Sequence, residues 1–264
     1  MKKFLVIGNP ISHSLSPTIH NYWFKNNKIE AVYEKKLVEE KDIEGLIEKV
    51  RLNEISGINI TVPFKNIVVP QMDHLTTEAN ITKSVNTVSL EGKKVVGHNT
   101  DVAGFELAIR HKKFDITKKK ILIIGAGGVV PSIIYSLMKM KSGEIFVTNR
   151  TIEKIEKIKN IFSEIKILEW GKRQEFDLII NATSVGLKEN DDIGLDLSIY
   201  GSNKFFYDVI YKPKETLFLK RAKHLGNQTE NGKMMFIYQA HQAFFIWNKV
   251  LPTIDQEVIN LINI

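Results

Sequence analysis

The stretch ILIIGAGGVVPSIIYSLM, residues 121–138, constrains the fold more than any other part of the sequence. An apolar strand runs directly into a glycine turn and then a helix, which is the context that a dinucleotide-binding turn requires. Gly125 and Gly127 allow a tight turn and let the backbone approach a pyrophosphate at the helix N-terminus. Val130 stands at the usual third glycine, so helix and strand must pack differently there. Pro131 is tolerated because it falls in the first helical turn. A glycine turn alone also fits a plain strand-to-helix connection.

The end of the next strand distinguishes between the two nicotinamide cofactors. An NAD enzyme usually has an Asp or Glu about 20 residues beyond the glycines, where it holds a ribose hydroxyl. This sequence has Asn149, Arg150 and Thr151 there, followed by Lys154. Arg150, Thr151 and Lys154 are suited to surround a 2′-phosphate with charge-assisted hydrogen bonds, which predicts NADP as cofactor. The alternative is that Arg150 is an exposed surface residue and Thr151 a helix N-cap.

Strand-like and helix-like segments alternate along the whole chain, which is typical of an α/β protein. In the first part, the sequence predicts strands at KFLVIG, AVYEKKLV and GINIT, helices from about Ser16 and Asp42, and a hairpin of NTVSL and KVVGHN around Gly92. In the second part, it predicts a helix at DVAGFELAIRHKKF and strands at EIFVTN, FDLIINAT and FFYDVIY. From about Met234 the periodicity is helical.

We therefore expect an α/β protein of two domains. Residues 101–233 are predicted to form a Rossmann-type nucleotide-binding domain, and residues 1–100 with the helical residues 234–264 the other domain. With 264 residues, of which 43% are hydrophobic, the chain is long enough to bury cores of this size.

The composition argues against several classes of protein. The absence of cysteine excludes disulfides, thiol nucleophiles and thiolate metal sites; we expect no metal and a reducing, cytoplasmic location. The first apolar run stops at Gly8, and no stretch approaches the roughly 20 apolar residues that cross a bilayer, so we expect no membrane partner. The net charge of +7 comes from lysines spread over amphipathic segments, which favours a solvated basic face over a nucleic-acid surface.

Two polar clusters follow predicted strands, at the position where α/β proteins hold ligands. In GNPISHSLSP, the hydroxyls of Ser14 and Ser16 precede a helix and are placed to receive a carboxylate, although Ser16 is equally suited to be a plain N-cap. In NITVPFK, Asn59 and Thr61 share one face of the strand, and Lys65 follows on the loop.

Two further stretches add polar residues. Asn86 follows the pair SV, and Asp101 ends the run GHNTD between a strand and a helix. By itself, Asp101 is equally well explained as an N-cap or as an acid of the first helical turn.

Together these stretches resemble the shikimate dehydrogenase family. The stretches that carry the resemblance cover nearly the whole chain in the family's order: GNPISHSLSP, GINITVPFK, SVNTV, GHNTDVAGF, IGAGG, NRT, NATSVG, YDVIYKP and NGKMMFIYQAHQAF. The resemblance implies NADP-dependent reduction of 3-dehydroshikimate to shikimate, on the pathway to chorismate and the aromatic amino acids. It also implies a small-molecule substrate, no nucleic-acid partner, and a monomer or a homodimer.

The resemblance also implies roles for individual residues. Lys65 is the catalytic lysine, paired with Asp101. The residues implied to hold or line the substrate are Ser14, Ser16, Asn59, Thr61, Asn86, Asp101, Tyr211 and Gln239. The residues implied to contact NADP are Gly125, Ala126, Gly127, Gly128, Val129, Asn149, Arg150, Thr151, Lys154, Val209 and Gly232.

Three positions depart from the family pattern: Ser84 and His241 replace alanines, and Pro131 stands where a basic residue is common. We expect altered affinities from these departures and no loss of activity. Two other functions stay open. One is a dehydrogenase that also accepts quinate or uses NAD; the other is a non-catalytic nucleotide-binding or basic nucleic-acid-binding module, which the presence of Lys65 and Asp101 disfavours.

Overall fold

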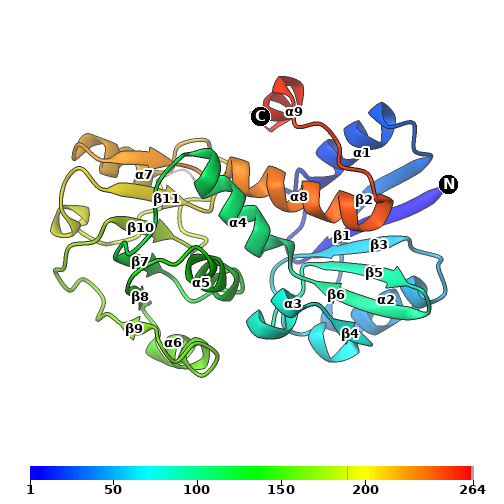
Figure 1. Cartoon of the computed structure of the whole chain (residues 1–264), viewed down its shortest axis with the longest axis horizontal. Coiled ribbons are helices and arrows are strands. Elements are labelled where there is room, and N and C mark those ends of the chain that lie inside the picture. Colours follow the sequence, from blue (N-terminus) through cyan, green and yellow to red (C-terminus); the bar gives the residue numbers. More distant parts are fainter. Residues whose placement is uncertain (189, 263–264) are drawn as a thin grey trace. The chain divides into compact units, whose positions relative to one another are not determined.

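The computed structural model describes residues 1–188 and 190–262 and contains two compact units (Figure 1). The first unit comprises Met1–Gly104 and Ile237–Ile264, and the second comprises Phe105–Phe236. The division falls inside two helices, α4 (Thr100–His111) and α8 (Lys233–Asn248), so each helix is continuous across it. The boundaries expected from the sequence lay at the first turn of each of these helices.

The first unit is built on a six-stranded mixed sheet in the order β2-β1-β3-β5-β6-β4. Its strands are β1 (Lys2–Gly8), β2 (Ala31–Leu37), β3 (Gly57–Ile60), β4 (His74–Leu75), β5 (Thr87–Glu91) and β6 (Lys94–His98). Its other elements are α1 (Ser16–Asn26), η1 (Glu40–Asp42), α2 (Ile43–Arg51), η2 (Val69–Gln71), α3 (Thr77–Thr82) and α9 (Gln256–Leu261), with most of α8. The strands β2, β1 and β3 are parallel, whereas β5 and β6 form the predicted antiparallel hairpin.

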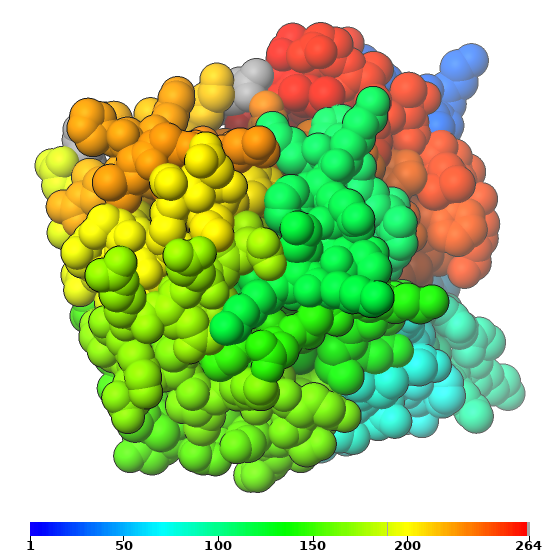
Figure 2. Space-filling model, turned by 60° about the vertical axis from the view of Figure 1, so that its left-hand side comes forward, coloured from blue at the N-terminus to red at the C-terminus, as the bar shows by residue number. Residues whose placement is uncertain are grey.

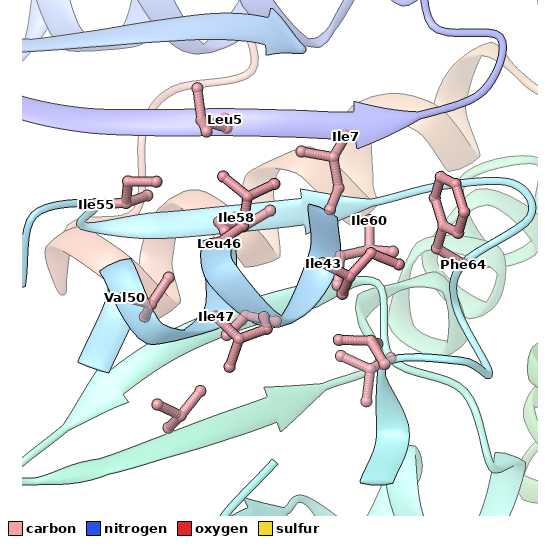
Figure 3. Close-up of a cluster of buried hydrophobic side chains, with 14 of the residues drawn as sticks. Leu5, Ile7, Ile43, Leu46, Ile47, Val50, Ile55, Ile58, Ile60 and Phe64 are labelled. Atoms are coloured by element: carbon pink, nitrogen blue, oxygen red, sulfur yellow. The ribbon is translucent and has the colours of Figure 1, made fainter. Parts of the chain in front are cut away.

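Helix α2 covers one face of this sheet with a regular apolar stripe. Its buried residues are Ile43, Leu46, Ile47 and Val50, at the i, i+3, i+4, i+7 spacing of one helical face. They pack against the side chains that β1 and β3 present on that face, namely Leu5, Ile7, Ile58 and Ile60 (Figure 3). Alternate residues of β1 therefore point toward α2, and a slip of one residue in the pairing of β1 would turn them to the other face.

The opposite face of the sheet is covered by aromatic residues. Phe4 of β1 lies 5.2 Å from the ring of Phe24 and 4.9 Å from that of Trp247 in α8. The Trp247 indole donates a hydrogen bond to the Val88 carbonyl at 3.0 Å and fills the space that a Cβ would need at Gly57. Helix α8, from the C-terminal part of the chain, thus completes the core on this face of the first unit's sheet.

The second unit is a parallel six-stranded sheet in the order β12-β11-β10-β7-β8-β9. Its strands are β7 (Ile121–Ile124), β8 (Ile145–Thr148), β9 (Lys166–Ile167), β10 (Leu178–Asn181), β11 (Phe205–Asp208) and β12 (Gln228–Glu230). Its other elements are α5 (Val130–Lys139), α6 (Ile152–Lys159), η3 (Leu197–Tyr200) and α7 (Leu217–His224). Counted within the unit, this is the 3-2-1-4-5-6 order of the dinucleotide-binding fold. On the surface, the segments around α6 and α7 lie at opposite ends of the unit (Figure 2), as this order requires.

The predicted strands and helices are confirmed, and Pro131 lies in the first turn of α5 as expected. Besides the three 3-10 helices η1 to η3 of the described residues, four short elements were not predicted: β4 and β9 have two residues each, β12 has three, and α3 has six. Such lengths are too short to show a period in the sequence. No helix within the described residues is long and apolar enough to span a membrane.

Candidate active site

Lys65 and Asp101 form a direct ion pair in the first unit. Lys65 lies in the turn after β3, and Asp101 in the first turn of α4. Nζ of Lys65 lies 2.6 Å from Oδ2 of Asp101, and the two side chains are only 13% and 8% exposed. Because solvent screens a partly buried pair less than a surface pair, the interaction holds the ammonium in a defined direction.

Amide side chains fix the start of α4, and with it the position of Asp101. Oδ1 of Asn86 accepts hydrogen bonds from the backbone N–H of Thr100 at 2.8 Å and from its hydroxyl at 3.1 Å. Oδ1 of Asn99 accepts from the backbone N–H of Asp101 at 3.1 Å, while its Nδ2 donates to Thr82 at 2.8 Å. Amides that would lack partners at a helix start are therefore satisfied. Asn86, which the family resemblance assigns to the substrate, thus supports the start of α4 through Thr100.

Asn59 is the centre of a buried hydrogen-bond network beneath the same loops. Its Oδ1 accepts from the Tyr33 hydroxyl at 2.6 Å, and its Nδ2 donates to the Asn86 carbonyl at 3.0 Å and to Oγ1 of Thr87 at 2.9 Å. Burial raises the pKa of Tyr33 well above its usual value, against a hydrogen bond from Ser16 that lowers it. Tyr33 is therefore a neutral donor that links β2 to β3.

His20 of α1 stacks on Tyr33, with ring centroids 4.4 Å apart and planes 1° from parallel. The imidazole is fully buried, and neither ring nitrogen has a hydrogen-bond partner within the described part of the chain. Burial lowers its pKa to about 3, so the ring is neutral and packs as an aromatic side chain.

The remaining expected substrate residues of the first unit lie in or next to α1, β3 and α8. Ser14 and Ser16 are buried, and the Ser14 hydroxyl lies 3.3 Å from that of Ser16. Thr61 follows β3 and Gln239 lies in α8; both are partly exposed. The alternative role of Ser16 as an N-cap is wrong, because α1 begins at Ser16 itself after Leu15 and has no side-chain cap.

The glycine turn of the second unit has room for a ligand. Gly125 has φ +114°, and a Cβ there would meet Ala182 and Thr183, so the tight turn requires glycine. Gly127 and Gly128 are exposed, and a Cβ at Gly127 would meet only the Ala182 carbonyl at 3.8 Å. No side chain caps the first turn of α5, so its backbone amides fit a pyrophosphate.

The end of β8 presents a polar, positively charged segment. Arg150, Thr151 and Lys154 are exposed, and Asn149 donates to the Thr151 carbonyl at 2.8 Å. Thr151 occupies the N-cap position of α6, but its side chain makes no capping hydrogen bond. Thr151 therefore takes the N-cap position without using its hydroxyl as a cap. The exposed side chains of Arg150, Thr151 and Lys154 fit a phosphate group.

The loops after β10 and β11 are braced by a buried carboxyl group, Asp208. It accepts hydrogen bonds from Oγ1 of Thr216 at 2.6 Å, from the N–H of Ile210 at 3.0 Å and from Nδ2 of Asn181 at 3.1 Å. Burial raises the pKa of Asp208 to about 6, and these hydrogen bonds oppose the rise. The carboxyl group thus fixes the direction of the backbone that follows β11.

This brace places two of the expected cofactor residues together. A Cβ at Gly232 would overlap the carbonyl of Val209, so the two backbones touch. Tyr211 stacks on Phe236 at 4.6 Å in the same unit.

The sequence did not single out Tyr33, His20, Asn181 or Asp208. Asn181 and Asp208 lie within NATSVG and YDVIYKP, two stretches that carry the family resemblance, so a signal existed for them. Tyr33 and His20 gave none, because an aromatic residue in a strand or helix usually belongs to the core. No group of three or more His, Asp or Glu residues that would suit a metal ion occurs in the described ranges.

The chain matches two family models in sequence. Residues 6–88 match the shikimate dehydrogenase substrate binding domain, and residues 106–187 match shikimate / quinate 5-dehydrogenase. The shikimate dehydrogenase (NADP(+)) of Pelagibacter ubique (strain HTCC1062) is 53% identical over 263 residues, which are 100% of this chain and 99% of that protein. This chain belongs to the shikimate dehydrogenase family.

Other members of the family extend the likeness. The shikimate dehydrogenase (NADP(+)) of Caldicellulosiruptor bescii is 39% identical over 273 residues, covering 100% of this chain and 95% of that protein. Among solved structures, the Thermus thermophilus shikimate 5-dehydrogenase in complex with NADP(H) and shikimate superposes with a TM-score of 0.90 at 29% identity, over 100% of this chain and 98% of that one. The Aquifex aeolicus shikimate dehydrogenase gives 0.89 at 32% identity, over 99% and 97%.

Proposed function

We propose that this protein reduces 3-dehydroshikimate to shikimate with NADPH. The observation that carries the proposal is the partly buried Lys65–Asp101 pair, in a unit whose sequence matches the family's substrate-binding domain. The exposed basic segment at the end of β8 supports NADP, because it offers Arg150 and Lys154 where an NAD enzyme usually has an acid. We assign residues 1–100 and 234–264 to the substrate-binding domain and residues 101–233 to the NADP-binding domain, with Asp101 and Tyr211 of the second range also assigned to the substrate.

The chemistry requires a hydride on the ketone carbon and a proton on its oxygen. Bound NADPH supplies the hydride. Lys65, as an ammonium, donates the proton, and its charge stabilises the negative charge that develops on oxygen. Asp101 holds Nζ in place through the 2.6 Å contact and accepts a hydrogen bond from a ring hydroxyl of the substrate.

The remaining assignments follow the family. Ser14, Ser16, Asn59, Thr61, Asn86, Tyr211 and Gln239 hold or line the substrate. The backbone from Gly125 to Val129, with Asn149 to Lys154, Val209 and Gly232, holds the cofactor. We place the enzyme in the cytoplasm, where a reducing environment suits a chain without cysteine, and expect a monomer or a homodimer.

The test is to follow the absorbance of reduced nicotinamide while shikimate or quinate is supplied with NADP or NAD. We expect the highest kcat/KM with shikimate and NADP. Faster reaction with quinate would favour the second activity that one family model names. Absence of turnover with every pair would contradict the proposal and favour a non-catalytic nucleotide-binding protein.

A further inference from the structure

Arg150 has two defined partners in the second unit. Its guanidinium carbon lies 5.4 Å from the centre of the Trp170 ring, and its Nη2 donates to the carbonyl of Ile193 at 3.1 Å. Trp170 follows β9, and Ile193 lies in the loop before η3, so two segments distant in sequence meet at this arginine. Neither Trp170 nor Ile193 belongs to the residues that the family resemblance assigns to NADP.

Both partners are themselves held in place. Trp170 is half-buried and packs on the hydrophobic cluster of this unit, which includes Leu168, Phe176 and Leu195. Ile193 is 4% exposed and belongs to the same cluster. The ring and the carbonyl are therefore anchored to the core, while the guanidinium that they contact remains at the surface.

The turn that presents the Ile193 carbonyl is also fixed. Gly194 has φ +71°, which favours glycine, and its N–H donates to Asp192 at 3.0 Å. Asp192 forms an ion pair with Arg221 at 2.7 Å and not with Arg150.

The charge of Arg150 is not neutralised by these contacts. Trp170 offers a ring face and Ile193 a carbonyl, and within residues 1–188 and 190–262 no carboxylate forms an ion pair with this guanidinium. An arginine has five N–H donors, of which Ile193 takes one, so most are left for a ligand. A planar, charged and fixed guanidinium is suited to a phosphate dianion.

We propose that Trp170 is a positioning residue that holds Arg150 for the 2′-phosphate of NADP, and thereby contributes to the preference for NADP over NAD. The inference rests on the proposed function, since it assumes that Arg150 receives this phosphate. A guanidinium that is already held loses less side-chain freedom when the phosphate binds. Cation–π contacts at exposed sites correspond to roughly 2- to 5-fold in affinity.

The experiment uses the full chain and two ligands that differ by one phosphate, adenosine 2′,5′-bisphosphate and adenosine 5′-monophosphate. Calorimetry gives both dissociation constants for the wild type, Trp170→Leu and Trp170→Phe. We expect Trp170→Leu to weaken binding of the bisphosphate by roughly 2- to 5-fold and to leave the monophosphate unchanged. Trp170→Phe keeps a ring face and should retain most of the wild-type affinity. In an Arg150→Leu background, Trp170→Leu should have no further effect.

The outcomes separate this inference from the function on which it rests. If both ligands weaken equally in Trp170→Leu, the ring acts on the adenosine or on the fold, and the inference is overturned. If Trp170→Leu changes neither affinity, it is also overturned. If the wild type binds both ligands equally, the NADP assignment itself fails.

A second measurement, on the wild type and Trp170→Phe alone, applies if Trp170→Leu does not fold. The Trp170 emission is obtained as the difference between the wild type and Trp170→Phe, titrated with each ligand. A response to the bisphosphate alone supports the inference, and no response, or an equal response to both ligands, overturns it.

Discussion

Asp208 gives the second unit an unusual dependence of stability on pH. The side chain is fully buried, and burial raises its pKa from 3.8 to about 6. Between these two values the folded protein keeps a proton that the unfolded chain has released. The free energy of unfolding therefore falls as the pH rises through this window. The contribution is fully present below pH 3.8 and is lost above about pH 6.

The size of the effect follows from the shift. A change of one pKa unit corresponds to about 1.4 kcal/mol, so a shift of roughly two units corresponds to about 3 kcal/mol. Other carboxylates of this unit act in the opposite direction. Hydrogen bonds from Ser198 lower the pKa of Asp196, for example, so its contribution is lost as the pH falls. The comparison must therefore be made against a variant that lacks only the Asp208 titration.

The assay is urea unfolding of the wild type and of Asp208→Asn at a series of pH values from about 4 to 7, followed by circular dichroism. We expect the stability of the wild type relative to the variant to fall by about 3 kcal/mol across this range. The absolute stability of Asp208→Asn also reflects altered hydrogen bonds, but these do not titrate. The exposed control Asp196→Asn should show a nearly constant difference from the wild type over this range, because the lowered pKa of Asp196 confines its titration to more acidic pH. A wild-type advantage over Asp208→Asn that stays constant or grows with pH would refute the reasoning.

Five other variants test the first unit. Tyr33→Phe leaves the buried amide oxygen of Asn59 without its hydrogen-bond donor, so we expect the free energy of unfolding to fall by about 1–3 kcal/mol. We also expect a higher KM for shikimate and an unchanged KM for NADP. An unchanged KM for shikimate would contradict a role of the Asn59 network in substrate binding. Gly57→Ala places a methyl group against the Trp247 indole of α8, and we expect it to lower stability by about 1–3 kcal/mol in thermal unfolding. Gly45→Ala is the control, because nothing lies within 4 Å of the added methyl group, and it should be neutral or stabilising. Equal effects of the two substitutions would contradict the packing of Trp247 on Gly57. Thr61→Ala and Gln239→Ala should raise the KM for shikimate more than they lower kcat, and steady-state kinetics showing the reverse would remove them from the binding set.

The sequence predicts those parts of the fold that local pattern determines. The buried strand β7, the turn at Gly125 and the helix α5 follow one another in sequence, so their order and the position of Pro131 could be inferred. The hairpin around Gly92 is local in the same sense. The strands β4 and β9 are only two residues long and form because neighbouring strands offer pairing partners, which no local pattern reports.

Contacts between residues distant in sequence could not be predicted from pattern. Lys65 and Asp101 are 36 positions apart, and only the family resemblance implied that they act together. The Tyr33–Asn59 hydrogen bond joins β2 and β3. The alternation of residues along these two strands is explained equally well by an apolar core without such a bond. Trp170 follows a two-residue strand, and its contact with Arg150 depends on how the second unit folds its surface loops.

The central claim is that Lys65 supplies the proton in the reaction, and turnover of Lys65→Ala tests it most directly. The rate of NADPH oxidation is measured at saturating 3-dehydroshikimate, and shikimate binding is measured separately by calorimetry. We expect turnover to fall by about 10²- to 10⁴-fold, with shikimate affinity changed less than about tenfold. A Lys65→Ala enzyme that turns over as fast as the wild type would contradict the account.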